Sequence, residues 1–265
     1  MYLIDYHTHT SFSSDSQAPM EDMILSAIDK GLDEMAITDH VDFDDRYDYT
    51  DYNRYIPYFN ELKEKYADKI KLCLGVEVGV DNYFKDKVNA FTKSFDFDFI
   101  IGSSHAVTGK DLYFDREVFF AGKTKQTAYN QYFSELLKNI ELCEDFCVYG
   151  HLDFVSRYGI YEDNSLKYAD YKDIIDEVLR TLINKGKGIE INTSGFRYGI
   201  ADAYPQLNIV KRYKQLGGEI ITVGSDSHFT RDVADHIGFA YDMLAEAGFK
   251  YITTFEKRKP VFVKL

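Results

Sequence analysis

The chain has few cysteines and no long hydrophobic run. Its three cysteines, Cys73, Cys143 and Cys147, are odd in number and lack paired C-x-x-C spacing, so we expect neither a disulfide framework nor a thiolate zinc site. The chain contains no run of about 18 apolar residues, which a membrane helix would need. The amino terminus lacks a basic segment followed by an apolar signal region. These absences predict a cytoplasmic protein with no membrane partner.

Positive charge is also scarce. The 31 Lys and Arg residues are outnumbered by 44 Asp and Glu residues, which gives a formal net charge of -13. Such a surface repels the phosphate backbone that nucleic-acid-binding proteins normally neutralise with Lys and Arg. Long nucleic acid is therefore an unfavoured partner, although bound divalent cations would offset part of the charge. The sequence carries no signal for an oligomeric state.

The chain does contain a repeated alternation of short β-rich runs and amphipathic helices. Seven strands are predicted, in the segments 2–7, 34–40, 70–79, 97–105, 146–153, 188–194 and 219–228. Between them, segments such as 19–31 and 171–186 carry helical apolar stripes that end at glycine. This alternation predicts parallel strands joined by crossover helices. Because no linker or low-complexity segment divides the chain, residues 1–265 are predicted to form a single domain.

Polar residues at the strand ends distinguish an open sheet from a barrel. Nearly every predicted strand ends, on its carboxyl side, in a histidine or an acidic residue. In an open sheet the ligand crevice lies at one switch point, whereas a β/α barrel brings all its carboxyl strand ends around one mouth. Only a ring lets all seven strands contribute to one site. The sequence therefore predicts an α/β barrel of seven units.

The strand ends carry the residues of a metal site. In the run IDYHTHT, His7 and His9 are two apart in an extended strand, so their side chains point the same way. Neutral imidazole and carboxylate suit Zn, Mn and Fe. A single catalytic ion takes about three protein ligands. The strand ends offer about nine histidines and acids as candidate ligands, which implies two or three ions. Such clusters clamp the attacking and leaving oxygens of a displacement at phosphorus or carbon, which predicts a metal-dependent hydrolase.

The ordered strand-end motifs resemble those of the polymerase and histidinol phosphatase (PHP) superfamily. They are D-x-H-x-H (Asp5, His7, His9), Asp15, T-D-H (His40), G-V-E (Glu77), S-S-H (His105), G-H-x-D (His151) and S-D-S-H (Asp226, His228). In size, and in lacking an appended domain, the chain is similar to the stand-alone histidinol phosphatases of that superfamily. The resemblance implies a distorted (β/α)7 TIM-like barrel with a trinuclear metal site. It also implies hydrolysis of L-histidinol phosphate to L-histidinol and phosphate, a step of histidine biosynthesis, by attack of a metal-bridging hydroxide.

The resemblance further implies how the ligands are shared. The first ion would be held by His7, His9, Glu77 and Asp226; Glu77 would bridge to a second ion completed by His105 and His151; Asp15, His40 and His228 would hold the third. Some members of the superfamily have histidine where this chain has Asp15. A carboxylate there favours harder ions such as Mn or Fe over Zn. We therefore expect two or three divalent ions, drawn from Mn, Fe and Zn.

Other acids and amides are expected behind the ligands. A ligating histidine usually gives its second ring N–H to a carboxylate or carbonyl, and Asp5, Asp39, Asp153 and Asn192 are placed for this role by the sequence. Asp5 could equally be a solvated acid at a strand end. Asp153 is also a candidate for protonating the leaving oxygen, and a metal-bound water is the alternative.

Two arginines are candidates for holding the phosphate. Arg157 and Arg197 both follow predicted strands, and each is succeeded by Tyr and Gly. The planar guanidinium matches phosphate oxygens bidentately, so both are predicted to hold the transferring phosphoryl group. The alternative is a surface arginine in a salt bridge at the rim. Replacing Arg197 by Ala is expected mainly to raise KM and to lower kcat/KM.

Substrate specificity is expected from the long loops 41–52 and 106–125, which are rich in acids and aromatics. A substrate with an ammonium and an imidazole suits carboxylates and aromatic rings. The candidates are Glu117, Asp111, Tyr158 and Tyr161.

Two other functions stay open. A nucleotide phosphatase or oligonucleotide exonuclease of the same superfamily would share the metal ligands, and the acidic balance argues against it. A non-catalytic metal-binding module would be expected to lack some of the ligands.

Overall fold

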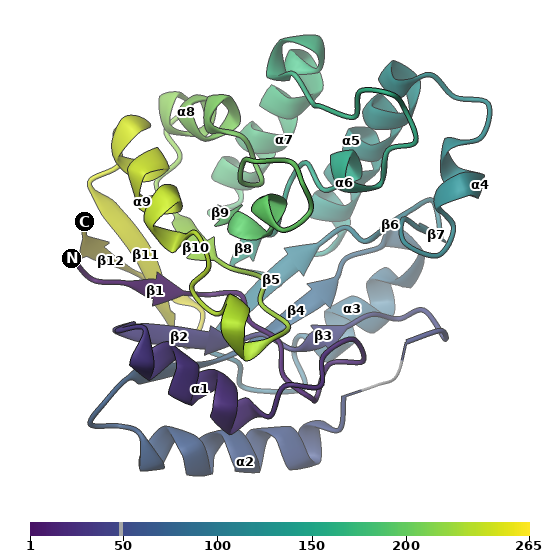
Figure 1. Cartoon of the computed structure of the whole chain (residues 1–265). Coiled ribbons are helices and arrows are strands. Elements are labelled where there is room, and N and C mark those ends of the chain that lie inside the picture. Colours follow the sequence, from purple (N-terminus) through teal and green to yellow (C-terminus); the bar gives the residue numbers. More distant parts are fainter. Residues whose placement is uncertain (48–49) are drawn as a thin grey trace.

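The computed structural model describes residues 1–47 and 50–265, and within them seven parallel strands form one curved sheet (Figure 1). In sheet order they are β1 (Ile4–Asp5), β2 (Glu34–Ile37), β4 (Lys71–Gly79), β5 (Phe99–Ser103), β8 (Val148–Tyr149), β9 (Gly188–Asn192) and β10 (Ile221–Gly224). The short β3 (His40–Val41) also pairs with β4. Each of the seven strands lies within one of the segments predicted from the sequence, whereas β3 was not predicted as a separate strand.

The first and last strands of this order meet, so the sheet is a nearly closed barrel. The amide of Tyr6 donates a hydrogen bond to the carbonyl of Val223 (2.9 Å), and the amide of Asp226 donates to the carbonyl of His7 (2.8 Å). A parallel bridge between Thr8 and Ser227 continues this contact beyond the strand ends. The predicted seven-unit α/β barrel is therefore confirmed.

Helices surround the barrel and follow the apolar stripes of the sequence (Figure 1). The longer helices are α1 (Met20–Asp29), α2 (Tyr52–Lys65), α3 (Lys85–Phe91), α5 (Lys125–Leu142), α7 (Lys172–Asn184), α8 (Leu207–Gln215) and α9 (Ile237–Glu246). In α7 the residues Ile175, Val178 and Leu182 are buried on one face, as a period of 3.6 requires. Gly186 follows with φ +67°, a left-handed conformation that suits glycine at a helix end.

Short elements occupy the connections between strands and helices. They are β6 (Ala106–Val107), β7 (Lys110–Asp111), α4 (Arg116–Phe120), α6 (Val155–Tyr158) and the 3-10 turns η1 (Asn82–Phe84), η2 (Tyr168–Asp170), η3 (Thr193–Phe196) and η4 (Thr230–Asp232). Three of them contain predicted phosphate or specificity residues: Arg157 and Tyr158 lie in α6, Asp111 in β7 and Glu117 in α4. None of the helices in the described ranges is long and apolar enough to cross a membrane.

A carboxyl-terminal hairpin, which we did not predict, closes the amino-terminal end of the barrel. It consists of β11 (Tyr251–Glu256) and β12 (Lys259–Lys264). The amide of Ile221 donates to the Thr253 hydroxyl (3.1 Å), and the amide of Phe255 donates to the Tyr6 hydroxyl (3.1 Å). The Phe255 ring also packs against Phe99, with centroids 5.0 Å apart. The aromatic core therefore fills this end and leaves the opposite, carboxyl end for polar side chains.

Candidate metal centre

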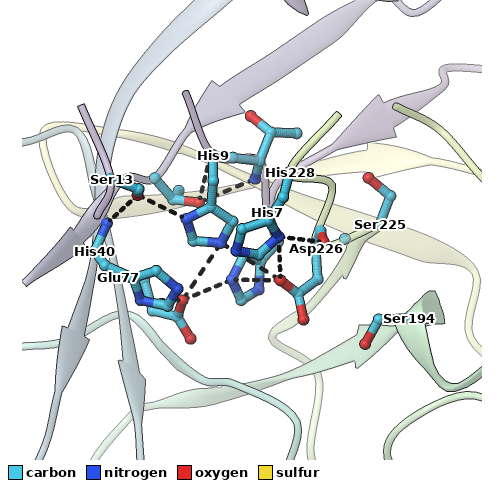
Figure 2. Close-up of polar contacts among 12 residues, drawn as sticks. His7, His9, Ser13, His40, Glu77, Ser194, Ser225, Asp226 and His228 are labelled. Carbon is cyan, nitrogen blue, oxygen red and sulfur yellow. Dashed lines mark hydrogen bonds and ion pairs between the residues drawn. The ribbon is translucent and has the colours of Figure 1, made fainter. Parts of the chain in front are cut away.

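The nine predicted metal ligands come together at the carboxyl end of the barrel. Figure 2 shows His7, His9, His40, Glu77, Asp226 and His228 pointing toward one another. Glu77, at the end of β4, lies in the middle of the cluster. Its oxygens are 2.9 Å from His7 Nε2, 3.0 Å from His151 Nε2, 3.1 Å from His40 Nδ1 and 3.3 Å from His105 Nε2.

Within the cluster, three sets of ligand atoms each lie within 4.8 Å of one another. They are His7, His9 and Asp226; His40, Glu77 and His105; and His9, His40 and His228. Asp15 Oδ2 lies 2.9 Å from His228 Nε2 and 3.5 Å from His40 Nε2. The structure thus brings Asp15, His40 and His228 together, as the resemblance implied.

Burial changes sharply across the cluster. The side chains of His7 and Glu77 are 0% and 1% exposed, whereas that of Asp15 is 46% exposed. The inner positions are therefore enclosed by the barrel, and the position beside Asp15 faces solvent.

The cluster keeps its acids ionised and one of its central imidazoles neutral. Burial, together with the facing imidazoles of His228 and His40, lowers the pKa of His9 to about 3. Burial would raise the pKa of Glu77, but the surrounding imidazoles, led by His7 and His40, outweigh it and hold that pKa well below its usual value. Metal ligands must be neutral imidazoles and ionised carboxylates. His9 and Glu77 already have those forms near neutral pH. Burial would lower the pKa of His7, His105 and His228, but the facing carboxylates outweigh it and instead raise that pKa, so these imidazoles would lose a proton when an ion binds.

The donor set fits a divalent metal. His9 Nε2 is buried and makes no hydrogen bond to any described residue, although carboxylate oxygens of Asp226 and Glu77 lie 3.4 Å and 3.5 Å away. His40 Nδ1 is likewise buried without a hydrogen bond. Leaving a buried polar atom without a partner is costly. Nitrogen and oxygen donors that converge in this way, with no sulfur among them, suit a divalent cation.

Three groups that contact ligand imidazoles were not predicted from the sequence. Glu190 Oε1 lies 2.6 Å from His7 Nδ1, Asp42 Oδ1 lies 3.0 Å from His105 Nδ1, and Ser13 Oγ lies 3.2 Å from His9 Nδ1. Glu190 had a signal that could have revealed it. It is the one charged residue in the run GIEIN, and a fully buried Glu needs a partner.

The predicted supporting acids Asp5 and Asp39 hold the backbone of the loops that carry ligands. Asp5 accepts hydrogen bonds from the amide (2.8 Å) and hydroxyl (2.5 Å) of Ser225 and from the amide of Ala234 (2.8 Å). Asp39 accepts from the amide (2.5 Å) and hydroxyl (2.8 Å) of Thr10, and its burial raises its pKa to about 6.

Asn192 is the third predicted supporting residue, and it contacts ligand side chains directly. Its Nδ2 lies 3.4 Å from Asp226 Oδ2 and donates to Glu190 Oε2 at 3.1 Å.

Asp153 lies behind the pocket wall. Its Oδ2 accepts a long hydrogen bond from the amide of Gln206 (3.4 Å), its Oδ1 has no partner among the described residues, and burial raises its pKa to about 7. The backbone turns at His151, whose φ is +21°, and the ring of Phe154, not the Asp153 carboxylate, lines the pocket. The structure therefore does not bring Asp153 to the point where a leaving group would lie.

A pocket of about 450 Å³ opens above the cluster. Its floor contains seven of the predicted ligands: Asp15, His40, Glu77, His105, His151, Asp226 and His228. The wall residues that follow β8 and β9 are Arg157, Tyr158 and Tyr198. Those that come from the long loops are Arg46, Tyr47, Asp111, Tyr113 and Phe114. A small molecule that enters this pocket meets the cluster at its base.

The two predicted phosphate arginines have different surroundings. Arg157 lines the pocket, and its side chain forms no ion pair with the described carboxylates. Arg197 does not line it. Its Nη2 donates to the carbonyls of Ser225 (2.5 Å) and Asp226 (2.8 Å), and its Nη1 donates to Asp235 Oδ2 (3.3 Å). Of these two arginines, Arg157 is the one whose charge faces the pocket without an ion pair to a described carboxylate.

Of the predicted specificity residues, two line the pocket and two do not. Asp111 and Tyr158 line the pocket, whereas Glu117 is exposed on α4 and the Tyr161 hydroxyl donates to the carbonyl of Lys123. Asp111 is itself held in place, because it accepts hydrogen bonds from the Tyr47 hydroxyl (2.9 Å) and from two backbone amides. In the predicted specificity loop 41–52, residues 48 and 49 lie outside the described residues.

Comparison with known proteins identifies the family of the chain. The model of the PHP domain matches residues 5–194. The chain is 36% identical to a histidinol-phosphatase of Lactococcus lactis, over 98% of this chain and 96% of that protein. It is 32% identical to a probable histidinol-phosphatase of Clostridium acetobutylicum, over 97% of this chain and 98% of that protein.

Solved structures agree. The crystal structure of histidinol phosphate phosphatase from Lactococcus lactis, complexed with Zn, L-histidinol and phosphate, matches with a TM-score of 0.91 at 35% identity over 98% of each chain. A putative histidinol phosphatase from Listeria monocytogenes, 21% identical, shares the fold with a TM-score of 0.77 over 89% of this chain and 99% of that one.

Proposed function

The chain belongs to the PHP domain family, and from that membership we propose that it is a metal-dependent phosphomonoesterase that hydrolyses L-histidinol phosphate to L-histidinol and phosphate. The observation that carries the proposal is the composition of the pocket. Seven imidazole and carboxylate side chains that are predicted ligands form its floor, and Arg157, which pairs with none of the described carboxylates, stands in its wall. A phosphate with an organic leaving group fits between a metal floor and a guanidinium.

The cluster would hold two or three divalent ions. In this proposal His7, His9, Glu77 and Asp226 hold the first ion, Glu77 with His105 and His151 the second, and Asp15 with His40 and His228 the third. When bound, such ions supply an activated water and positive charge for the phosphoryl oxygens. Zn is bound in the Lactococcus lactis relative, and the Asp15 carboxylate of this chain also suits Mn or Fe.

Arg157 is proposed to bind the phosphate oxygens that point away from the cluster. Its guanidinium carries five N–H donors, and stacking on the Tyr198 ring orients its plane without occupying them. The side chain is therefore held ready before substrate arrives. Its charge would also offset the negative charge that develops on the transferring group.

The part of the pocket wall that comes from the long loops is proposed to bind the cationic leaving group. The Asp111 carboxylate, fixed by the Tyr47 hydroxyl, faces the same pocket as the rings of Tyr113 and Phe114. A carboxylate and aromatic rings suit an ammonium and an imidazole, the two cationic or polar groups of L-histidinol. Glu117 is exposed and lies outside this wall.

The experiment is a comparison of substrates. Phosphate release by Mn²⁺-reconstituted protein should be measured with L-histidinol phosphate, AMP, a nucleoside 3',5'-bisphosphate and a 5'-phosphorylated trinucleotide. We expect L-histidinol phosphate to lead in kcat/KM by about two orders of magnitude or more, because a cationic leaving group gains about 1.5–3 kcal/mol from a charged hydrogen bond. Protein stripped with a chelator should release no phosphate until the metal is restored.

The same assay distinguishes the alternatives. If a nucleotide leads, the leaving-group assignment is wrong, while the metal centre and Arg157 keep their proposed roles. If metal-replete protein hydrolyses none of the substrates, the phosphatase proposal fails and a non-catalytic metal-binding module takes its place.

A further inference from the structure

Glu190 is a buried carboxylate beside the cluster that the proposed reaction does not use. It lies inside β9 and is 1% exposed. Because Asn192 is two residues further along the same strand, both side chains point into the barrel. An ionised Glu is almost never fully buried unless it is paired, so its partners indicate why it is there.

The two oxygens of Glu190 contact two different predicted ligands. Oε1 lies 2.6 Å from Nδ1 of His7, which comes from β1. Oε2 accepts a hydrogen bond from the backbone amide of His151, which follows β8, at 3.1 Å. One carboxylate on β9 therefore contacts the predicted ligand of β1 and the predicted ligand that follows β8.

The contact with His7 settles which ring nitrogen faces the cluster. A carboxylate can only accept at this position, so His7 Nδ1 must carry a proton. The second nitrogen, Nε2, lies 2.9 Å from Glu77 Oε2 and 3.9 Å from Asp226 Oδ1. By the same rule Nε2 donates to Glu77 while no ion is bound, and Nε2 is the nitrogen that would give up its proton to bind an ion.

The contact with His151 holds an unusual backbone conformation. His151 has φ +21°, which is sparsely populated for a residue with a Cβ and costs energy. The hydrogen bond from its amide to Glu190 stabilises this turn. As a result, His151 Nε2 is directed to within 3.0 Å of Glu77 Oε1.

The surrounding sequence leaves space for this carboxylate. A Cβ added at Gly224 would overlap the Cβ of His7 and come 2.5 Å from Glu190 Oε1. A Cβ added at Gly150 would come 2.5 Å from the Ser103 hydroxyl and 3.4 Å from Glu190 Oε2. Gly224 at the end of β10 and Gly150 just after β8 thus provide the room that the Glu190 side chain occupies.

We propose that Glu190 is a positioning residue for the metal centre, which fixes the tautomer of His7 and the backbone turn of His151 so that both imidazoles present Nε2 to the ions. This inference depends on the metal-binding part of the proposed function and not on the identity of the substrate. Glu190 itself would touch neither substrate nor ion.

The test compares two buried glutamates. In the unaltered protein, Glu190 Oε2 accepts hydrogen bonds from the His151 amide and from Asn192 Nδ2. Glu190→Gln removes the negative charge and can place its own amide N–H groups opposite these donors, where no hydrogen bond can form. Glu34→Gln is the matched control. Glu34 is also fully buried, but it accepts from the hydroxyls of Tyr6 (2.6 Å) and Tyr2 (3.0 Å) at the amino-terminal end of the barrel.

The readout is the affinity for Zn²⁺ and Mn²⁺, measured by chelator competition, with bound metal counted by elemental analysis. We expect Glu190→Gln to weaken the tightest ion about 10- to 100-fold and Glu34→Gln to change the Kd less than about twofold. Equal losses in both variants, or no loss in folded Glu190→Gln, would overturn the proposal.

A second measurement on the unaltered protein covers the case in which Glu190→Gln does not fold. In the Zn²⁺-loaded, ¹⁵N-histidine-labelled protein, NMR should show a proton on His7 Nδ1 and none on Nε2. A protonated Nε2, or Zn²⁺ on Nδ1, would overturn the proposal. If these metal results hold but no phosphomonoester is cleaved, the proposed function fails while the role of Glu190 stands.

Discussion

The guanidinium carbon of Arg157 lies 3.2 Å from the centre of the Tyr198 ring. This contact places a positive charge in the wall of the pocket, where no described carboxylate neutralises it. Replacing Arg157 by Met should therefore lower kcat/KM for a phosphomonoester about 10- to 100-fold, which corresponds to one or two charge-assisted hydrogen bonds. Arg180→Met, at an exposed position of α7, is the matched control. Equal kinetics for both variants would remove Arg157 from the phosphate site.

Arg197 should behave differently from Arg157, although the sequence predicts the same role for both. Its guanidinium binds the carbonyls of Ser225 and Asp226 and so holds the loop that carries a predicted ligand. We expect Arg197→Met to lower the free energy of unfolding by about 1–3 kcal/mol and to reduce the metal content, with KM unchanged once the metal is restored. Denaturant titration and steady-state kinetics at saturating metal check this. A raised KM in fully loaded protein would return Arg197 to the phosphate site.

Asp5 should be important for stability rather than for chemistry. Its carboxylate accepts three hydrogen bonds from Ser225 and Ala234 and is fully buried. In Asp5→Asn the new amide N–H groups would face those donors, so we expect a loss of about 2–3 kcal/mol in urea unfolding. Asp29→Asn, at the exposed end of α1, should change the unfolding free energy by less than about 0.5 kcal/mol. A loss as small in Asp5→Asn would contradict this account.

The ion pair between Asp176 and Arg212 should make stability depend on pH. It joins α7 to α8, with Nη2 of Arg212 2.5 Å from Asp176 Oδ2. The hydrogen bond from Arg212 lowers the pKa of Asp176 below its usual value, despite the opposing effect of burial. A depressed carboxyl pKa contributes stability above the unfolded pKa of about 3.9 and loses that contribution as the pH falls through the folded value.

We therefore expect Asp176→Asn to be less stable than the unaltered protein by about 0.5–1 kcal/mol at pH 7. The difference should shrink as the pH falls below about 3.9, the unfolded pKa of the carboxyl group. Glu177→Gln, at the exposed neighbouring position, should show no such trend. Unfolding curves at several pH values measure both variants, and a difference that grows toward acid pH would be the wrong sign.

The nine predicted ligands could be found from the sequence because parallel strands put their carboxyl ends together. His7 and His9, like Asp226 and His228, are two apart, and the period of a strand predicts that each pair shares one side. Asp226 and His228 nevertheless follow the end of β10, where Asp226 has φ +55°, so a turn and not the strand period brings this pair to the cluster. Glu77 lies near the carboxyl end of the longest predicted strand. These relationships are local and depend only on strand direction and closure of the barrel.

The remaining parts of the site depend on long-range packing that local patterns do not contain. Arg157 and Arg197 share the same following dipeptide, Tyr-Gly, yet α6 directs one to the pocket and η3 directs the other to the β10 loop. Asp153 is two residues past His151, but the positive φ at His151 breaks the strand alternation. Glu190 acquires its role only because β9 lies beside β8 and β10, and β10 beside β1.

The hairpin of β11 and β12 has a kinetic consequence. It covers the amino-terminal end of the barrel, where Thr253 and Phe255 are buried against β10 and β1. The pocket that reaches the cluster opens at the other end. In the described part of the chain, substrate and both products of the proposed reaction therefore share one route, so inorganic phosphate held at the proposed Arg157 site would block the next substrate molecule until it has left.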